Sequence, residues 1–487
     1  MNRSSLSSPL PWLIFAIAAG TRLSGLDLDG LDHDELWTAN LLLQPIGDQL
    51  YALWRDTHPP LPHLLLVLWS ALFGISEPAL RVLPALMGIA AVVVAYVELA
   101  PRVGRTAATV VALCIALLPG HIYYSQETRN YAQAFLATTW VCTRLLAYID
   151  TGGARRERIL LAIACGLLLF SHYGGALTIT ATMLAALLCV GGSARERMRR
   201  VLVLGLTTFA ICAPVLPHLI ATKLIYATNF YSQPMTWPAV RGYLTIPFWW
   251  GQLSGLVFGV GLLLSLLLAL LPRHRARLGA LALLWWLPFA VVMIVSATSK
   301  QGLLNHRLAI VLAPPAIIAI VLASLSLFDG QPERRRRIAA AMVALLASAL
   351  SVARLVEVDF YSVSKRDQVR RLAARVRAVS KDGDRVISID PIWMLLGGRM
   401  HYYFTRHGMA YPIPLRSYSR GVGGPPLPKA IAQARRDHKR RLVIVAGRRP
   451  MHEGRVERAL LSAGARLVHH ESYRPRHVTM YLAVFEL

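Results

Sequence analysis

The chain has 487 residues, of which 55% are hydrophobic and 16% are charged, and its mean hydropathy is +0.47. A soluble protein of this length would carry nearer a quarter charged residues, so the composition excludes an ordinary soluble enzyme. The net charge of +26 is also typical of nucleic-acid-binding proteins. Much of it lies in short connections between apolar runs, however, and this distribution argues against nucleic acid as a partner.

Apolar runs recur from Pro9 to about Leu355 and then stop, which predicts an α-helical polytopic membrane protein with a soluble tail. The first run follows a single cation, Arg3, and has no small-residue cleavage site after it. This indicates a retained span rather than a removed signal peptide. We expect spans at about 9–26, 80–99, 105–120, 130–149, 158–171, 174–191, 200–220, 253–271, 279–298, 307–327 and 337–355.

A further apolar stretch, residues 61–73, is short and opens after His58-Pro59-Pro60. If it crossed the bilayer, the later arginine-rich connections would lie on the opposite side from the N-terminus, against the positive-inside rule. We therefore predict a juxtamembrane helix, held at the membrane surface by Trp54 and Trp69. About eleven transmembrane helices result, with a cytoplasmic N-terminus. Arginines cluster at Arg102/Arg105, Arg155/Arg156/Arg158, Arg195/Arg197/Arg199/Arg200, Arg273/Arg275/Arg277 and Arg334 to Arg337.

The chain is expected to form two domains. Residues 1–356 are the transmembrane domain, with an external acidic loop at 27–58, and residues 357–487 are a periplasmic or extracellular domain. In that tail, helical patterns at about 364–379, 428–437 and 452–463 alternate with strand-like runs, which predicts a small α/β domain with a mixed sheet. The strand-like runs are Arg385–Asp390, Arg441–Ala446, Arg466–His469 and His477–Phe485.

All the cysteines lie inside apolar runs, and no pair of them has metal-ligand spacing. We expect neither disulfides nor a Cys-based zinc site. A buried cysteine behaves as a small hydrophobic residue, and this accounts for Cys114, Cys142, Cys165, Cys189 and Cys212.

Carboxylates crowd the loop after the first span, where mutual repulsion is costly unless a cation or some chemistry uses them. They are Asp27, Asp29, Asp32, Asp34 and Glu35. For the first three we favour a solvated loop that caps a helix. We predict that Asp34 and Glu35 are a catalytic pair, in which one carboxylate takes a proton from an acceptor hydroxyl or amine. The second carboxylate orients the first or holds a cation.

Three other groups on the predicted outer face could meet a phosphate. His58 precedes the juxtamembrane helix, where it either contacts a lipid phosphate or faces water. In Tyr124-Ser-Gln-Glu-Thr-Arg129, charges at a membrane boundary are costly and usually functional. The planar fork of Arg129 suits phosphate, although an arginine can also snorkel to headgroups. Lys300, His306 and Arg307 either receive a lipid phosphate or anchor a helix end.

Four motifs occur in an order and at a spacing that resemble a known family. They are Asp34-Glu35, His58-Pro-Pro-Leu61, Phe73-Gly-Ile-Ser-Glu-Pro-Ala-Leu-Arg81 and Tyr124-Ser-Gln-Glu-Thr-Arg-Asn-Tyr131. Over roughly residues 10–330 the chain looks like the bacterial GT-C glycosyltransferases related to protein O-mannosyltransferases and lipid A aminoarabinose transferases.

The resemblance implies a polyprenyl-phosphate sugar donor and a lipid, glycan or protein acceptor at the outer face of a bacterial inner membrane. It implies that Asp34 is the general base, that Glu35 supports it, and that Glu127 is an acid near the donor head. His58 stands where aminoarabinose transferases have a lysine. No cofactor is required, and Asp34 and Glu127 are the residues that would hold a divalent metal ion. Tyr124, Arg129 and the Lys300, His306 and Arg307 group would complete the donor site.

Direct displacement assisted by one base would invert the anomeric carbon. The main alternative is a transporter or flippase of a lipid-linked glycan. A transporter is expected to show two related halves with broken helices and charges near mid-membrane, whereas here the charges cluster at one face and no halves repeat. A non-catalytic membrane assembly or sensor protein is a third interpretation.

Overall fold

The computed structural model describes residues 8–226, 235–245, 252–298, 306–361, 368–381, 384–389, 402–403, 413–414, 432, 435–437, 439, 441–446, 461–462, 464–473 and 480–486. The chain divides into two compact units. The helical unit comprises Met1–Leu26 and Ile46–Ser362, and the sheet unit comprises Asp27–Pro45 and Val363–Leu487.

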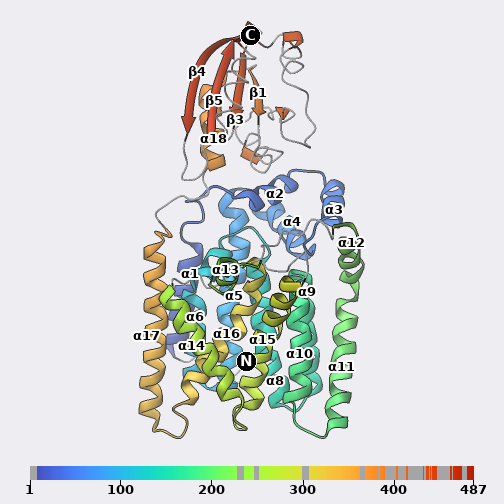
Figure 1. Ribbon diagram of the computed structural model, residues 1–487, viewed down its shortest axis with the longest axis vertical. Helices are drawn as coiled ribbons and strands as arrows, with labels where there is room; N and C mark the ends of the chain where they lie inside the picture. The colour runs from blue at the N-terminus through green and yellow to red at the C-terminus, as the bar shows by residue number, and fades with distance from the viewer. Residues whose placement is uncertain are drawn as a thin grey trace. The chain divides into compact units, whose positions relative to one another are not determined.

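Long helices packed side by side make up the helical unit (Figure 1). Its elements are α1 (Pro9–Leu23), α3 (Ile46–Trp54), α4 (Leu61–Phe73), α5 (Glu77–Val103), α6 (Arg105–Leu117), α7 (Pro119–Ser125), α8 (Tyr131–Asp150), α9 (Arg155–Ser171), α10 (Gly175–Cys189), α11 (Ala194–Cys212), η2 (Ala213–Val215), α12 (Leu216–Tyr226), α13 (Trp237–Thr245), α14 (Gln252–Ala269), α15 (Arg275–Thr298), η4 (His306–Leu312), α16 (Ala313–Ser326) and α17 (Glu333–Glu357).

Every predicted span overlaps helical structure, and residues 61–73 form α4 as expected. Three spans cover more than one element: 105–120 runs across the break between α6 and α7, 200–220 includes parts of α11 and α12 with η2 between them, and 307–327 includes η4 and α16. Among the described residues, five helices are long and apolar enough to cross a membrane, and the bent pair α6–α7 would be a sixth. The five are Glu77–Val103, Ala194–Thr222, Arg275–Thr298, Ala309–Ser326 and Glu333–Glu357. A helical multi-pass membrane protein is thereby supported, whereas the number of eleven spans stays a prediction.

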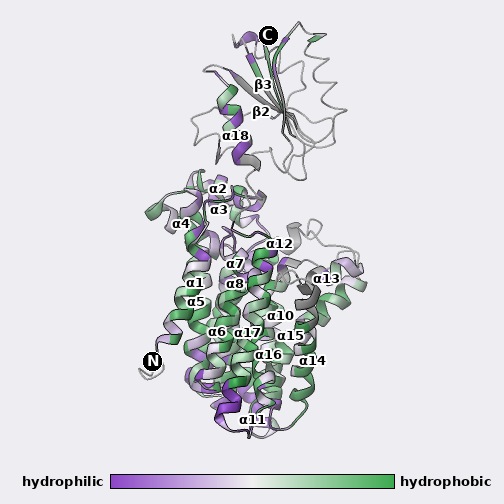
Figure 2. Ribbon diagram, turned by 90° about the vertical axis from the view of Figure 1, so that its left-hand side faces the viewer, coloured by the Kyte–Doolittle hydropathy of each residue, from purple (hydrophilic) through white to green (hydrophobic). Residues whose placement is uncertain are grey.

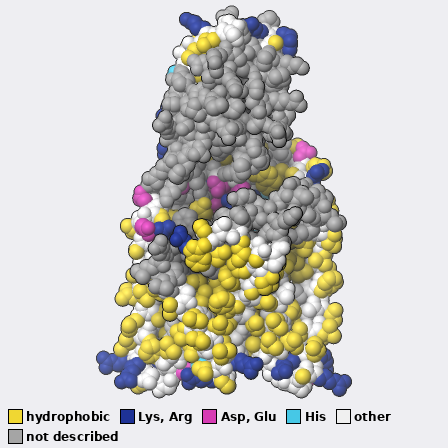
Figure 3. Space-filling view, in the orientation of Figure 1, with side chains coloured by type: hydrophobic (Ala, Val, Ile, Leu, Met, Phe, Trp, Pro, Cys, Tyr) yellow, Lys and Arg dark blue, Asp and Glu magenta, His cyan; other side chains and the backbone are white. Residues whose placement is uncertain are grey.

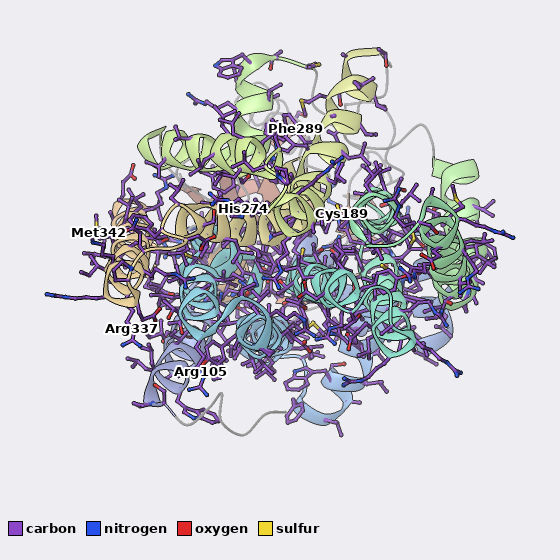
Figure 4. The ribbon with its side chains drawn as sticks, turned by 90° about the horizontal axis from the view of Figure 1, so that it is seen from below. Arg105, Cys189, His274, Phe289, Arg337 and Met342 are labelled. Carbon is purple, nitrogen blue, oxygen red and sulfur yellow. The ribbon has the colours of Figure 1, made fainter. Side chains whose placement is uncertain are left out.

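Positive charge gathers at one end of the bundle, below a broad apolar belt (Figures 2 and 3). Figure 4 looks onto this end and labels Arg105 at the start of α6, His274 between α14 and α15, and Arg337 near the start of α17. Helices α3, α4 and α12 lie at the opposite end of the unit (Figure 1). This asymmetry is the one that the positive-inside rule describes. Within the basic end, buried Arg144 of α8 pairs with Glu98 of α5 and with Glu157 of α9.

The sheet unit holds a five-stranded mixed sheet in the order β2-β1-β3-β5-β4. Pairs β1–β2 and β1–β3 are parallel, and β3–β5 and β4–β5 are antiparallel. Four of the strands lie where the sequence predicts them. The elements are α2 (His33–Leu42), α18 (Gln368–Val379), β1 (Arg385–Ile389), β2 (Ile413–Pro414), β3 (Arg441–Ala446), β4 (Arg466–Tyr473) and β5 (Met480–Glu486).

The division of the chain differs from the predicted domains in one respect. The acidic residues 27–45 cluster with the C-terminal residues rather than with the helices that precede and follow them in the chain. The reason is that their hydrogen bonds run to the C-terminal segment, as Leu31 N–H does to Tyr403 Oη.

Helix starts follow local sequence signals. Ser76 Oγ accepts the Ala79 N–H at the start of α5, and Ser193 and Glu196 form a capping box at the start of α11. Helix α8 is buried almost all round. There the hydroxyls of Thr138 and Thr139 donate to carbonyls four residues earlier, so no polar group of theirs is left unsatisfied in apolar surroundings. All five cysteines are free thiols.

Arg22 holds together the place where α6 ends and α7 begins at an angle of 60°. Its side chain is fully buried, and its guanidinium donates to the carbonyls of Ile115 (3.0 Å) and Ala116 (2.9 Å). These carbonyls lie at the end of α6, where the helix break removes their usual partners. Nη2 also lies 2.8 Å from His121 Nδ1, which accepts the bond because arginine can only donate.

Gly88 allows α7 to approach α5 closely. A Cβ atom at this position would lie 2.1 Å from Ser125 Oγ and 3.0 Å from Arg22 Nε. We expect Gly88→Ala to lower the free energy of unfolding by about 1–3 kcal/mol through overpacking, measured as a fall in the melting temperature in detergent. The matched control is Gly20→Ala on α1, where nothing lies within 4 Å of the added atom. Equal melting temperatures for the two variants would contradict the close approach.

Candidate functional site

Two amide side chains fix the ends of the loop between α7 and α8. Gln126 Nε2 donates to the carbonyl oxygens of Thr21 (3.3 Å), Arg22 (3.2 Å) and Ser24 (2.8 Å), which are left open where α1 ends. Asn130 Nδ2 donates to the carbonyl of Ser171, the last residue of α9, at 2.7 Å. The loop is therefore tied to α1 on one side and to α9 on the other.

Between these ties lie Glu127 and Thr128, which are both buried, and the half-buried Arg129. Tyr124 is also buried, and its ring packs on those of Tyr123 and Tyr131 with centroid separations of 5.2 and 4.8 Å. Tyr124 thus supports the loop by packing. The predicted role of its hydroxyl at a donor phosphate stays a prediction.

Arg129 meets His58 in the helical unit, although 71 residues separate them. Arg129 Nη2 lies 3.4 Å from His58 Nε2, and His58 Nδ1 lies 3.2 Å from Asp56 Oδ1. Because arginine only donates, Nε2 accepts, and the proton of a neutral imidazole is then on Nδ1 and donated to Asp56. The three side chains form a relay of hydrogen bonds, Arg129 to His58 to Asp56, which we call the Asp56 relay.

The Asp56 carboxylate lies in a mostly buried place. Burial by itself would raise its pKa, but the hydrogen bond from His58 and the positive charge of Arg129 outweigh burial, so the pKa of Asp56 lies below its ordinary value. Asp56 is therefore ionised near neutral pH. It provides the negative charge that holds the imidazole and, through it, the guanidinium.

Burial keeps His63 and His172, two histidines close to the relay, neutral at neutral pH. Burial lowers the pKa of His63 to about 4, and the charge of Arg129 adds to this effect against the opposing charge of Asp56. His63 Nε2 lies 3.4 Å from Gln49 Oε1, which ties α4 to α3. Burial lowers the pKa of His172 to about 3, with a further contribution from His58. Neither His63 nor His172 therefore adds positive charge beside Arg129 at neutral pH.

The predicted catalytic pair lies in the sheet unit, in the first turn of α2. Asp32 Oδ1 accepts the N–H groups of Asp34 and Glu35, each at 2.9 Å, and Glu35 Oε2 accepts the Asp32 N–H at 3.0 Å. This is a capping box. Glu35 is fully buried, whereas Asp34 is partly exposed. Of the two carboxylates, Asp34 is therefore the one that faces outward, and Glu35 holds the turn that carries it.

Three predicted donor-site residues remain: Lys300, His306 and Arg307. Lys300 lies outside the described residues, as does the side chain of His306, whose backbone begins η4. Arg307 is half-buried in η4. In the part of the chain that the structure describes, no three His, Cys, Asp or Glu side chains gather as a metal site would require. The metal ion expected at Asp34 and Glu127 concerns residues of different units and stays a prediction.

Several residues that the structure makes important were not among the predicted site residues. Asp56 is two positions before His58 and could have been found as an acid beside the His-Pro-Pro motif. Arg22, an arginine inside the first apolar run, was a signal because such residues are rare and usually functional or structurally paired. Trp69 was expected to anchor α4 at the membrane surface; its indole N–H donates to the Ala79 carbonyl at 2.7 Å and so ties α4 to α5.

The Asp56 relay makes a prediction about pH. A carboxyl group whose folded-state pKa is depressed adds stability above its unfolded pKa of about 3.9 and loses it as the pH falls through the folded-state value. We expect Asp56→Asn to cost about 1–3 kcal/mol at pH 7 and progressively less below about pH 4. The measurement is the melting temperature in detergent against pH. Asp48→Asn, at an exposed position on α3, is the control and should show little change. If Asp56→Asn lowered the melting temperature by the same amount at every pH, the result would argue against the relay.

A family model and solved structures agree with the motifs. Residues 57–220 match the family described as dolichyl-phosphate-mannose-protein mannosyltransferase. This segment contains His58, Glu127 and Arg129. None of the curated proteins matches the chain.

The fold is shared with ArnT from Cupriavidus metallidurans. The apo structure of that protein has a TM-score of 0.60 at 12% identity, and its undecaprenyl phosphate complex has a TM-score of 0.58 at 12% identity. In both, 97% of this chain covers 97% of that chain. The archaeal oligosaccharyltransferase AglB from Archaeoglobus fulgidus, in complex with an inhibitory peptide and a dolichol-phosphate, has a TM-score of 0.56 at 14% identity. Here 91% of this chain covers 69% of that chain.

These matches span both units of the chain, and the motif order predicted them. The predicted resemblance is confirmed: this chain is a membrane protein with the GT-C glycosyltransferase fold, and its residues 57–220 match the dolichyl-phosphate-mannose-protein mannosyltransferase family.

Proposed function

We propose that the chain is an inverting glycosyltransferase that moves a hexose or pentose from a polyprenyl-phosphate donor to a lipid, glycan or protein acceptor. We place the reaction at the outer face of a bacterial inner membrane, with the N-terminus cytoplasmic. The observation that carries the proposal is the Asp56 relay, because it holds Arg129 in a fixed orientation within the segment that matches a family of polyprenyl-phosphate-sugar enzymes.

Arg129 suits the phosphate of the donor. Its guanidinium presents parallel N–H groups that match two phosphate oxygens, and this match is lost if the side chain rotates freely. The bond to His58 limits that rotation. When the bond between the anomeric carbon and the phosphate oxygen breaks, the electron pair stays on the phosphate. A fixed cation beside it stabilises the added charge, so the leaving group needs no strong acid.

Asp34 suits the role of general base. The acceptor hydroxyl or amine attacks the anomeric carbon from the side opposite the phosphate, and its proton passes to the Asp34 carboxylate. One displacement of this kind inverts the anomeric centre. The capping box supports this role, because Asp32 and Glu35 fix the turn while the Asp34 carboxylate stays partly exposed. No cofactor is part of the proposal.

A flippase of a lipid-linked glycan is the alternative function. It would move the donor across the membrane without breaking the bond between sugar and phosphate. The two functions therefore differ in whether free polyprenyl phosphate appears, and this difference provides the test.

The first experiment measures release of free undecaprenyl phosphate by the purified protein in lipid vesicles. The donors are undecaprenyl-phosphate-linked mannose, glucose, arabinose and aminoarabinose, with membrane extract as the source of acceptor. We expect release by the wild type and a loss of about 10²–10⁴-fold in Asp34→Asn, the range for removing a general base. Asp27→Asn, an exposed acid of the same loop, should retain activity. No release by the wild type with any donor would favour the flippase.

The role of Arg129 can be tested by binding alone. We expect Arg129→Gln to weaken binding of undecaprenyl phosphate by about 10–100-fold, because hydrogen bonds to charged groups contribute about 1.5–3 kcal/mol. Arg129→Lys keeps the charge but not the fork and should fall between. The control is Arg55→Gln, which removes an exposed cation in the connection between α3 and α4. If Arg55→Gln weakened binding as much as Arg129→Gln, general charge rather than a phosphate site would explain the result.

A further inference from the structure

Three contacts join the acidic segment to the C-terminal part of the sheet unit. Arg370 of α18 donates to the carbonyls of Asp27 (3.0 Å) and Leu28 (3.3 Å). The Leu31 N–H donates to Tyr403 Oη at 2.7 Å. The Tyr402 N–H donates to Asn40 Oδ1 at 2.7 Å. More than 340 residues of chain separate the partners in each contact.

The contacts lie on both sides of the predicted base. Asp27, Leu28 and Leu31 precede α2, and Asn40 is in its last turn. Asp34 lies between them, in the first turn. The C-terminal segment therefore forms hydrogen bonds on both sides of Asp34: before the start of α2 and in its last turn.

Helix α2 and the acidic segment before it need these hydrogen bonds to stay ordered. Helix α2 has ten residues, and isolated helices of this length are marginal in water. The segment before it also carries several carboxylates, whose mutual repulsion favours spreading. Helix α18 contains no acid and supplies the arginines Arg370, Arg371, Arg375 and Arg377. Its charge is thus opposite to that of the acidic segment of the same unit.

The residues that contact the acidic segment lie in or next to ordered parts of the sheet unit. Tyr402 and Tyr403 are buried, with their rings 5.1 Å apart, and they lie in the connection from β1 to β2. Arg441, the first residue of β3, donates to the Val379 carbonyl at the end of α18 and pairs with Asp384 just before β1. The Arg441 contacts therefore hold the C-terminal end of α18, the helix that carries Arg370, against the sheet.

We propose that the C-terminal part of the sheet unit is a positioning element for the proposed general base Asp34, and that Tyr403 and Arg370 are its positioning residues. The inference rests on the proposed function of Asp34 as general base. It gives the C-terminal domain a role in the rate of the reaction rather than in binding the donor. The Tyr403 hydroxyl acts through Leu31, at the residue before the capping box, and so on the orientation of Asp34.

The test is Tyr403→Phe in the full chain, which removes one hydroxyl and leaves the buried Leu31 N–H without its acceptor. Two quantities are measured. The first is amide hydrogen exchange of peptides covering residues 27–45, which needs no substrate. The second is kcat and KM for undecaprenyl phosphate release with the donors named above. We expect exchange to be about 5- to 160-fold faster, which corresponds to the cost of about 1–3 kcal/mol for an unsatisfied buried donor, and kcat to fall while KM for the donor stays unchanged.

Tyr402→Phe is the matched control, because Tyr402 contributes its backbone N–H to Asn40 and the substitution keeps that group. Arg370→Gln is the second test variant and should resemble Tyr403→Phe. Exchange of residues 27–45 that is unchanged in both Tyr403→Phe and Arg370→Gln would overturn the inference. So would a rise in KM at constant kcat.

Failure of the two proposals can be told apart. If Asp34→Asn were as active as the wild type, the general base would be wrong, and the exchange measurement would still report on the hydrogen bonds to residues 27–45. If Asp34→Asn were inactive while Tyr403→Phe kept wild-type exchange and kcat, the result would support Asp34 as general base and contradict the positioning role of Tyr403.

Discussion

The helical unit depends on the neutralisation of a helix break inside an apolar bundle. Where α6 gives way to α7, carbonyl groups lose their helical partners, and apolar surroundings offer no water to replace them. Arg22 supplies the missing donors from α1, and His121 accepts another of its N–H groups. Gly88 leaves the space that α7 needs. One buried cation therefore fixes the direction in which the loop between α7 and α8 leaves the bundle.

That loop carries the residues on which the proposed chemistry rests. Gln126 and Asn130 use their amides on the ends of α1 and α9, so these two polar residues of the motif have structural roles. Arg129 is the residue of this loop that we propose to contact the donor phosphate, and the charge of Asp56 orients it through the imidazole of His58. A guanidinium held in this way loses little additional freedom when it meets a phosphate.

The acidic segment follows the same principle in the sheet unit. Side chains that look equivalent in the sequence have separate tasks, because Asp32 and Glu35 satisfy backbone N–H groups while Asp34 remains partly exposed. The segment is short and self-repelling, and its order comes from residues at the far end of the chain.

The features that depend on local pattern could be predicted from the sequence. Hydropathy located the helices, strand-like patterns located four strands, and the order of four motifs indicated the GT-C fold. Which polar residues serve as caps and ties could be learned only from the folded chain, since Gln126, Glu35 and Arg129 look equally functional in the sequence. The tertiary structure also decided that residues 27–45 belong with the C-terminal segment. These outcomes depend on hydrogen bonds between residues up to several hundred positions apart, and no local pattern encodes such distances.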